Sequence, residues 1–544
     1  MSATVSPRST DARNQPPPIP DHNAYEAHVA LREALHREGA GWAEDRLRAL
    51  GALTGRQDVR ELGRLANENP PILRTFDRYG HRIDEVEFHP AWHELLEHAT
   101  AHGLHSLPWR EPRPGAHTAR AAMFLTWNVE AGHGCPISMT YSAVPALRKD
   151  LAIAAEWEPR IHPYAYDRRF IPASQKDAVL FGMAMTEKQG GSDVRANITR
   201  AEPVGQDGEY EIFGHKWFCS APMCDAFLVL AQADGGLTCF LLPRFRPDGS
   251  RNAFHLQRLK DKLGNRSNAS SEVELRGAWA RMVGEPGRGV ATIIEMVGHT
   301  RLDCVIGAAA GMRVGVEQAT WQTAHRSAFG RLLADQPLMR NVLADLALES
   351  EAATATAMRL ARSYDDDGQA AFKRIATAVA KYWTCKRAVP HAAEALECFG
   401  GNGYVEESGM PRLYREAPLN GIWEGSGNVI SLDVLRALVK TPETFEAFFA
   451  EVDEATGADA RLDAFVAATK AELSEPETLE LRARRLVERM ALSLQGSLLV
   501  RHAPPAVADA FVASRVAGEA GRAFGTLPAG TDFAGILERH ALTG

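Results

Sequence analysis

One carboxylate stands out as a candidate catalytic group because of the residues around it. Glu424 follows Trp423 inside the glycine-rich stretch Gly421–Gly427, and a second glycine cluster, Gly400–Gly403, lies before it. Glycine serves where the backbone must take a positive φ or approach a ligand closely. If this loop folds inward, desolvation raises the pKa of the Glu424 carboxyl toward that of a general base. Most glycine-rich loops are only turns, so this interpretation depends on the rest of the chain.

Three further stretches carry groups that could bind a heterocycle and a phosphate. Met183–Asp193, at an expected strand end, offers hydroxyls and free backbone N–H groups. In His215–Ser220, Trp217 offers a flat stacking surface, and in Arg326–Gly330 a guanidinium could pair with pyrophosphate. Each stretch is weak evidence alone, because a Thr-Glu pair is usually a turn or cap and a strand Trp usually belongs to a core.

The hydrophobic pattern that must position these groups changes twice along the chain. Up to about residue 180, apolar residues recur at helical spacing. Short apolar runs punctuated by Gly, Asp or Pro then predict an antiparallel sheet or barrel of about 100 residues. From Gly289 the helical period returns in four long segments that predict an antiparallel bundle, and Pro390 is expected to kink or break the third.

The predicted fold class is therefore α+β, mainly α. At 544 residues the chain is too long for a single core, so several domains are expected. Its predicted segments are a disordered N-terminal arm at 1–22, a helical domain at 23–180, a middle antiparallel β domain at 181–287, a four-helix bundle at 288–440, and an extra C-terminal helical domain at 441–544.

Composition argues against several classes of protein. The net charge of −8 gives no global basic field of the kind that attracts nucleic acid. No apolar run approaches the roughly 18 residues that span a bilayer, and the N-terminus lacks the apolar segment of a secretory signal. Seven scattered cysteines, without a C-x-x-C pair, indicate free thiols in a reducing cytoplasm and argue against structural zinc. We therefore expect a cytoplasmic location, no membrane contact and no metal site.

Six motifs, taken in chain order, resemble those of the acyl-CoA dehydrogenase family. The resemblance covers roughly residues 179–438, and the helical block before it is consistent with that family. Because six motifs occur in the family's order, the resemblance is specific. The motifs are Met185–Asp193, Lys216–Ser220, Lys262–Asn268, Arg326–Gly330, Gly400–Tyr404, and Arg415–Ala417 with Ile422–Ser426.

The resemblance implies FAD as the cofactor and an acyl-CoA as the substrate. Glu424 would take the α-proton, and the β-hydrogen would leave as hydride to the flavin. In this family the Arg326 motif reaches the FAD of a neighbouring subunit. Gly425–Ile430 nearly matches a dinucleotide-binding G-x-G-x-x-G pattern, but no strand precedes it. The residues expected to contact FAD are Met185, Thr186, Gly191, Ser192, Trp217, Phe218, Cys219, Ser220, Arg326, Phe329, Gly400, Gly401, Trp423, Gly425, Ser426 and Asn428.

The sequence departs from the family pattern at three positions. Cys219 replaces a Thr, which weakens a hydrogen bond to the flavin edge unless Ser220 supplies it. Asn268 replaces a Ser, and Trp423 replaces a smaller Tyr beside the base, which could narrow the acyl cavity. The chain also extends about 100 residues past the last motif. These features resemble the AidB-type branch, the alkylation-response flavoproteins. That branch is tetrameric, binds double-stranded DNA through a C-terminal helical domain, and has weak, isovaleryl-CoA-like dehydrogenase activity.

Residues 441–544 carry positive charge that could bind DNA only in local clusters, not over the whole block. They hold 10 Lys and Arg against 16 Asp and Glu, a net charge of −6. Arginines nevertheless cluster after Glu480, and stripes from the subunits of a homotetramer could merge into a groove. The alternative is a solvated helix face. The residues expected to contact DNA, without sequence specificity, are Arg436, Arg482, Arg485, Arg515 and Arg522.

Two other functions remain open. The chain could be an ordinary acyl-CoA dehydrogenase for a short or branched acyl-CoA, with Glu424 as base and a C-terminal extension that only builds the oligomer. It could instead be an acyl-CoA oxidase, in which oxygen rapidly reoxidises the reduced flavin.

Overall fold

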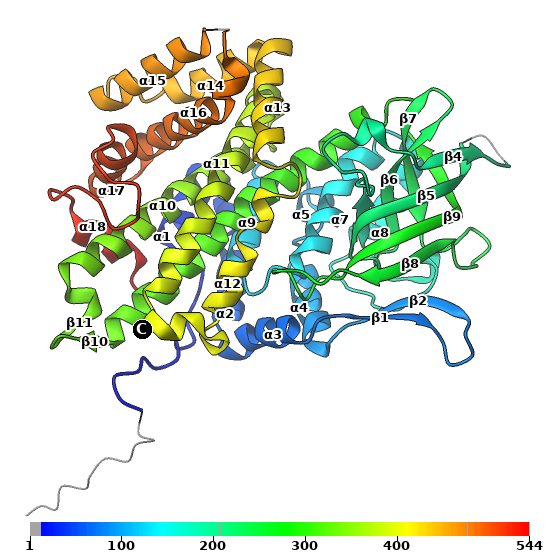
Figure 1. Ribbon diagram of the computed structural model, residues 1–544, viewed down its shortest axis with the longest axis horizontal. Coiled ribbons are helices and arrows are strands. Elements are labelled where there is room, and N and C mark those ends of the chain that lie inside the picture. Colours follow the sequence, from blue (N-terminus) through cyan, green and yellow to red (C-terminus); the bar gives the residue numbers. More distant parts are fainter. Residues whose placement is uncertain (1–11, 206–207, 476, 543–544) are drawn as a thin grey trace, which may run out of the picture.

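The computed structural model describes residues 12–205, 208–475 and 477–542. A long central helix bundle carries a β-barrel at one end and further helices along its other side (Figure 1). The predicted class, α+β with mainly helix, is confirmed. Within the described ranges, no helix is long and apolar enough to cross a bilayer.

The N-terminal block contains helices and one hairpin that the sequence analysis missed. Strands β1 (Ile72–Phe76) and β2 (Arg82–Glu87) pair antiparallel and extend below the barrel in Figure 1. The expectation that this block contains only helices and loops was wrong here. The sequence of β2 is mostly charged and lacks the apolar residues by which a core strand is recognised. The helices are α1 (Val29–Arg37), α2 (Glu44–Thr54), α3 (Gln57–Glu68), α4 (Pro90–Ala101), α5 (Leu107–Arg110), α6 (Ala116–Thr126), α7 (Gly134–Leu147) and α8 (Leu151–Ile161).

The middle block is a seven-stranded barrel. Its order is β3-β6-β4-β5-β9-β7, with β6 also pairing with β7 to close the ring and β8 pairing with β9. Most pairs are antiparallel, but β3 and β4 each run parallel to β6, so the expected purely antiparallel sheet needs correction. The strands are β3 (Phe181–Ala184), β4 (Arg200–Pro203), β5 (Glu209–Ser220), β6 (Ala226–Ala233), β7 (Gly236–Pro243), β8 (Phe254–Leu259) and β9 (Ser270–Val283).

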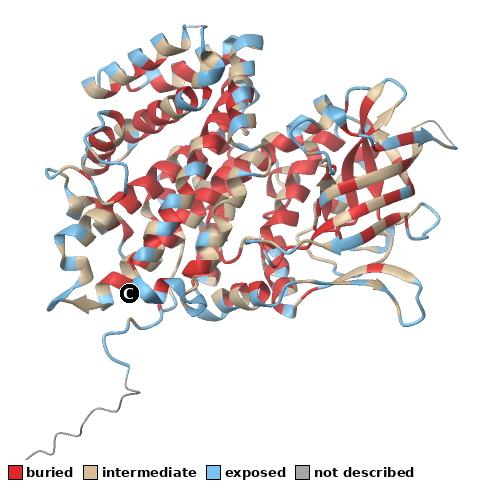
Figure 2. Cartoon of the chain, viewed as in Figure 1, coloured by how far each residue is buried: buried red, intermediate tan, exposed pale blue. Residues whose placement is uncertain are grey.

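The bundle is formed by α9 (Gly289–His325), α10 (Pro337–Arg362), α11 (Ala370–Glu397) and α13 (Gly427–Lys440), with the short α12 (Met410–Glu416) beside them. Its interior faces are buried (Figure 2). Helix α11 continues through Pro390, so the predicted break is absent. Proline removes one donor, but the buried residues on both sides of it keep the helix packed.

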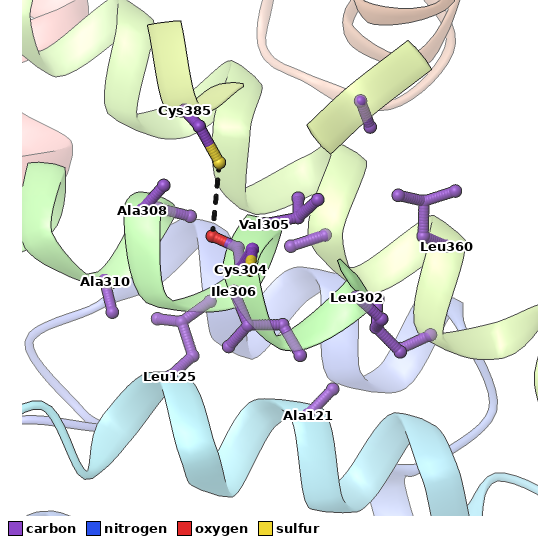
Figure 3. Close-up of a cluster of buried hydrophobic side chains, with 14 of the residues drawn as sticks. Ala121, Leu125, Leu302, Cys304, Val305, Ile306, Ala308, Ala310, Leu360 and Cys385 are labelled. Carbon is purple, nitrogen blue, oxygen red and sulfur yellow. Dashed lines mark hydrogen bonds between the residues drawn. The ribbon is translucent and has the colours of Figure 1, made fainter. Parts of the chain in front are cut away.

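Helix α9 is the central element of this core. Figure 3 shows its residues Leu302 and Ile306 packed near Ala121 and Leu125 of α6. On the α11 side, the Cys385 thiol donates to the Cys304 carbonyl at 3.6 Å. All seven cysteines are buried and free.

The C-terminal block packs along the bundle on the side away from the barrel (Figure 1). Buried ion pairs hold it there: Arg515 pairs with Asp345 and Glu349 of α10, and Arg539 pairs with Glu351 at 2.7 Å. Its helices are α14 (Glu443–Asp453), α15 (Ala460–Leu473), α16 (Leu479–His502), α17 (Pro505–Phe511) and α18 (Phe533–Leu537).

Part of the predicted N-terminal arm is bound to the bundle. Residues 1–11 lie outside the described residues. Asn14 exchanges two hydrogen bonds with the backbone of Ser327, at 2.7 and 2.6 Å, and the Trp321 indole donates to the Pro17 carbonyl at 2.7 Å. The expectation of disorder therefore does not hold at residues 14–17, because the end of α9 supplies partners that composition cannot reveal.

Candidate functional site

The Glu424 loop joins η8 (Leu419–Gly421) to α13 in a conformation that two cations stabilise. Glu424 has φ +57°, a left-handed conformation that is costly for a residue with a Cβ. Lys381 of α11 donates to the carbonyls of Trp423, at 2.8 Å, and Gly425. Arg301 of α9 donates to the Glu424 carbonyl at 3.0 Å. Three consecutive carbonyls are thus fixed by charged donors from two long helices.

The Arg301 guanidinium is itself fixed by a carboxylate. Asp433 of α13 pairs with Arg301 at 2.8 Å and with Arg374 of α11 at 2.7 Å. These two arginines hold the pKa of Asp433 below its usual range, against the effect of its burial. Helices α9, α11 and α13 are therefore coupled around the loop, which limits how far Glu424 can move.

The Glu424 carboxyl is poised for proton transfer. Burial raises its pKa, while Thr300, Arg301 and Lys381 oppose that rise. Its Oε2 atom is buried and has no hydrogen-bond partner in the described structure. A desolvated carboxylate oxygen that is not engaged by the protein is available to accept a proton from a bound molecule.

Residues of the N-terminal block and barrel lie across from this carboxyl. Burial raises the pKa of the Cys135 thiol to about 11, and the nearby Glu424 adds to that rise, whereas Lys262, Asn268 and Ser220 oppose it. Lys262 donates to the Asn268 carbonyl at 2.6 Å and to the hydroxyl of Ser270 at 2.9 Å. Burial lowers the pKa of Lys262 to about 8. Lys262, Asn268 and Ser220 of the barrel block thus lie near Cys135, which in turn lies near Glu424.

The prediction that the Cys219 side chain contacts the flavin is wrong. Its side chain is fully buried, and burial raises the pKa of its thiol to about 12. The pairing of β5 with β9 is irregular between Lys216 and Cys219, which shifts the alternation of faces along the strand. Cys219 therefore lies inside the barrel and is not available to the flavin edge, whereas Ser220 is half-buried beside Ser270.

The other barrel residues form a second group at the strand ends. Trp217 donates its backbone N–H to the Thr186 carbonyl at 2.9 Å, and a Cβ at Gly191 would lie 2.4 Å from the Thr186 hydroxyl. The loop therefore accommodates only glycine at 191. Lys260 lies over the Trp217 ring at 3.6 Å from its centre, and Phe218 is 51% exposed. Met185 is half-buried, and Ser192 is exposed.

The adjacent Glu187 has a structural role that the motif alone did not reveal. It pairs with Lys216 at 2.9 Å, with both side chains buried, and accepts from the N–H groups of Ile198 and Thr199. These bonds hold the pKa of Glu187 at about 2, despite burial. The Glu187–Lys216 pair fixes the loop that carries Thr186.

Four of the predicted cofactor residues lie far from Glu424. Arg326, Phe329, Gly400 and Gly401 follow the ends of α9 and α11, and Phe329 is 98% exposed. From Arg301 to the end of α9 the axial rise is about 36 Å, at 1.5 Å per residue. Gln15 of the arm contacts Arg326 at 3.4 Å and Asn402 at 3.2 Å. Within one chain, this cluster cannot share a ligand contact with Glu424. The other predicted residues, Trp423, Gly425, Ser426 and Asn428, lie in the Glu424 loop or at the start of α13.

Of the five arginines predicted to contact DNA, three are exposed and two are occupied by bonds within the protein. Arg436 and Arg522 are exposed, and Arg485 is 65% exposed while pairing with Glu472 at 2.9 Å. Arg515 is wrong as a predicted contact, because it lies buried in its ion pairs with α10. Arg482 is also unsuited, because its guanidinium donates to three backbone carbonyls between residues 472 and 477.

The site and fold define an acyl-CoA dehydrogenase-type flavoprotein, and comparisons with known proteins agree. Residues 182–278 match the acyl-CoA dehydrogenase middle domain, and residues 287–439 match the C-terminal domain of that family. Residues 14–168 match the N-terminal domain of the adaptive response protein AidB. The chain belongs to the acyl-CoA dehydrogenase family and is a homologue of AidB.

Three relatives illustrate the extent of the similarity. The putative acyl-CoA dehydrogenase AidB of Escherichia coli is 47% identical over 92% of this chain and 93% of its own length. The crystal structure of Caenorhabditis elegans ACDH-11 in complex with C11-CoA has a TM-score of 0.82 and 28% identity, covering 93% of this chain and 91% of that one. An acyl-CoA dehydrogenase complexed with FAD from Bacillus anthracis shares the fold at a TM-score of 0.60, with 18% identity and coverage of 79% and 78%.

Membership of this family assigns FAD as the cofactor, as predicted. The residues present fit that group. The turn beside Thr186, where a Cβ at Gly191 would clash, and the Ser220 hydroxyl would hold the cofactor at the barrel edge, and the Glu424 carboxyl lies on the bundle side. The sequence analysis missed Arg301 and Lys381, the two residues that hold the Glu424 loop. Each is a single cation within a mostly apolar stretch of a long helix, and this pattern could have marked them as candidates.

Proposed function

We propose that this chain catalyses α,β-dehydrogenation of an acyl-CoA with Glu424 as the base. The buried and unpartnered Oε2 atom of Glu424 carries this proposal, because it combines a raised pKa with a free acceptor site. FAD, when bound, accepts the hydride that leaves the β-carbon. The similarity to a protein solved with C11-CoA supports an acyl-CoA as the substrate class.

The chain's own residues position and protect the base. Lys381 and Arg301 hold the loop by its carbonyls and leave the carboxyl free. Trp423 is half-buried, and its indole N–H donates to Asn420 Oδ1 at 2.9 Å, which fixes the ring of the residue next to the base. Because the carboxyl must be ionised to accept a proton, the same desolvation that raises its pKa also makes it a stronger base.

An anaerobic titration with isovaleryl-CoA, followed at the flavin absorption band, tests this proposal. Glu424→Gln should slow flavin reduction by about 10²–10⁴-fold, the usual contribution of a general base. Glu443→Gln, an exposed position at the start of α14, is the matched control and should reduce at the normal rate. An unchanged rate in Glu424→Gln would refute the assignment, and fast reoxidation by oxygen would instead favour an oxidase.

A second candidate function is non-specific binding of double-stranded DNA in the response to alkylation damage, with only weak isovaleryl-CoA dehydrogenase activity. The homology to AidB supports it, together with the exposed, cationic side chains of Arg436, Arg485 and Arg522. We further propose a cytoplasmic homotetramer in which Arg326 and the exposed Phe329 meet the FAD of a neighbouring subunit. The axial distance from Glu424 supports this arrangement, since one chain cannot bring the two groups together.

Salt-dependent DNA binding tests this second proposal. Arg436→Glu with Arg522→Glu should weaken duplex binding and flatten its salt dependence, because fewer counterions are released. Arg200→Glu with Arg258→Glu, at two exposed barrel positions, changes the net charge by the same amount and is the matched control. Equal loss in both variants would mean that only total charge matters, and no loss would remove these arginines from the interface.

A further inference from the structure

A polar cavity lies away from Glu424, which is not among its lining residues. It has a volume of about 350 Å³ and is bounded by β2 of the hairpin, Phe170 and the segment that joins β7 to β8. Its charged lining consists of four arginines and one aspartate: Arg82, Arg244, Arg246, Arg251 and Asp84. Its volume lies in the range of small-molecule sites, and none of the residues predicted to contact FAD lines it.

Arg244 is the unusual member of this lining. Its side chain is 4% exposed, and it donates to the carbonyls of Pro222 and Asp84. No carboxylate lies within ion-pair distance of it among the described residues. Burial lowers the pKa of Arg244 to about 10. A buried guanidinium without a counter-ion is unfavourable, so an anion in the cavity would stabilise it.

The other three arginines are balanced by acids. Arg82 pairs with Asp84 at 2.8 Å, Arg246 with Glu211 at 3.3 Å, and Arg251 with Glu85 at 2.5 Å. Arg244 therefore gives the cavity one excess positive charge. The cavity is also rigid, because Phe170 lies between the guanidinium groups of Arg244 and Arg251, 4.8 and 5.0 Å from its ring centre.

Asp84 supplies the second half of the recognition chemistry. The residue is 7% exposed, and its Oδ1 atom is buried without a hydrogen-bond partner. Its Oδ2 atom is occupied by Arg82 at 2.8 Å. A buried carboxylate oxygen without a donor favours a ligand that brings an O–H group. The cavity thus presents an uncompensated cation and an unfilled acceptor together.

We propose that this cavity binds a phosphate group that carries or adjoins a hydroxyl donor, such as hydrogen phosphate or a sugar phosphate. Guanidinium groups match phosphate oxygens in geometry and charge. The hydroxyl donates to Asp84 Oδ1, while Arg244 faces the negative oxygens. This site is separate from acyl-CoA chemistry, so its test does not depend on the proposed function.

Isothermal titration of the full-length FAD-bound protein at pH 7.5 tests the proposal by comparing inorganic phosphate with sulfate at equal ionic strength. Sulfate has the same charge as hydrogen phosphate but no O–H group. One hydrogen bond to a charged group corresponds to about 10-fold or more in affinity, so phosphate should bind at least about 10-fold more tightly. Ribose 5-phosphate distinguishes the sources: tighter binding than inorganic phosphate would indicate a phosphate ester as the natural ligand.

Two variants make the test specific. Asp84→Asn should reduce the preference for phosphate over sulfate to about 2-fold or less, because the amide can also donate. Arg246→Gln should weaken both anions, and it avoids the fully buried Arg244, whose replacement could prevent folding. Arg200→Gln removes one exposed barrel cation outside the cavity and should leave binding unchanged. Equal binding of both anions by the unaltered protein, or equal effects of Arg246→Gln and Arg200→Gln, would overturn the proposal.

Discussion

Replacing Lys381 by Met isolates the contribution of the cations that hold the Glu424 loop. Lys381 is 1% exposed and donates to the carbonyls on both sides of Glu424. A hydrogen bond to a charged group contributes about 1.5–3 kcal/mol, and the left-handed conformation of Glu424 costs about 1–2 kcal/mol. Losing both bonds while Arg301 remains should therefore cost the active conformation about 3 kcal/mol, which is roughly 100-fold in its population.

The assay is single-turnover reduction of the flavin by acyl-CoA under anaerobic conditions. In Lys381→Met the rate constant should fall roughly 100-fold, while the dissociation constant for acyl-CoA changes little. The pH profile gives a second readout. Glu424 must be ionised, so the rate rises with pH through its pKa, and Lys381 holds that pKa down against burial. Removing Lys381 should move the acidic limb of the profile to higher pH.

The matched control is Lys440→Met, at the exposed end of α13, which should leave both readouts unchanged. Urea unfolding followed by circular dichroism separates a local effect from general destabilisation. A Lys381→Met protein that stays folded, reduces its flavin at the normal rate and keeps its pH profile would refute the idea that these bonds hold the base in place.

Three further predictions concern buried charges. Arg120→Met leaves Asp303 buried without its partner, so stability should fall by about 3–5 kcal/mol, and adding Asp303→Leu should restore most of it in urea titrations. Neighbouring arginines hold the pKa of Glu349 at about 2 despite burial. Its ionised form therefore stabilises the folded state above the ordinary carboxyl pKa, and this contribution is lost as the pH falls. Glu349→Gln should flatten the pH dependence of the urea midpoint between pH 5 and 2. Arg515→Gln should lower the melting temperature without changing DNA affinity, whereas Arg522→Glu should weaken DNA binding without changing the melting temperature. Weaker DNA binding by Arg515→Gln at an unchanged melting temperature would return Arg515 to the DNA interface.

The sequence predicted the fold class and the Glu424 loop because both depend on local patterns. The change from a helical to a strand period is readable in a short window, and a carboxylate among glycines marks an unusual turn. The cations that fix this turn were not predictable in the same way. Arg301 and Lys381 lie 123 and 44 residues from their acceptors at Glu424 and Gly425, and only the packing of α9 against α11 brings them together.

Two wrong site predictions have the same physical origin. Cys219 was assigned to the flavin edge because it occupies the Thr position of the family motif, but an irregularity in the pairing of β5 between Lys216 and Cys219 shifts the face on which the following residues lie. Arg515 was assigned to DNA because its local sequence contains few acids, yet Asp345 and Glu349 of α10 neutralise it from 170 and 166 residues away. In both cases the deciding partner belongs to another element, so composition near the residue gives no indication of it.

The C-terminal block can bind a polyanion only through the positive charge that remains on its surface. Its net charge of −6 does not describe its surface. Arg501 pairs with Glu451 inside the block, whereas Arg515 and Arg539 pair with Glu349 and Glu351 of α10. What a phosphate backbone meets is the charge left on the surface, and Arg436, Arg485 and Arg522 belong to that surface. Arg436 lies on α13, which begins at the Glu424 loop. A DNA contact at Arg436 could therefore shift the helix whose Asp433 pairs with Arg301. If the two functions are coupled, duplex DNA should therefore alter the rate of flavin reduction, and Arg436→Gln should remove that effect. Because Arg436 also pairs with Asp433 at 3.7 Å, the effect of DNA is measured against the rate of the same variant without DNA.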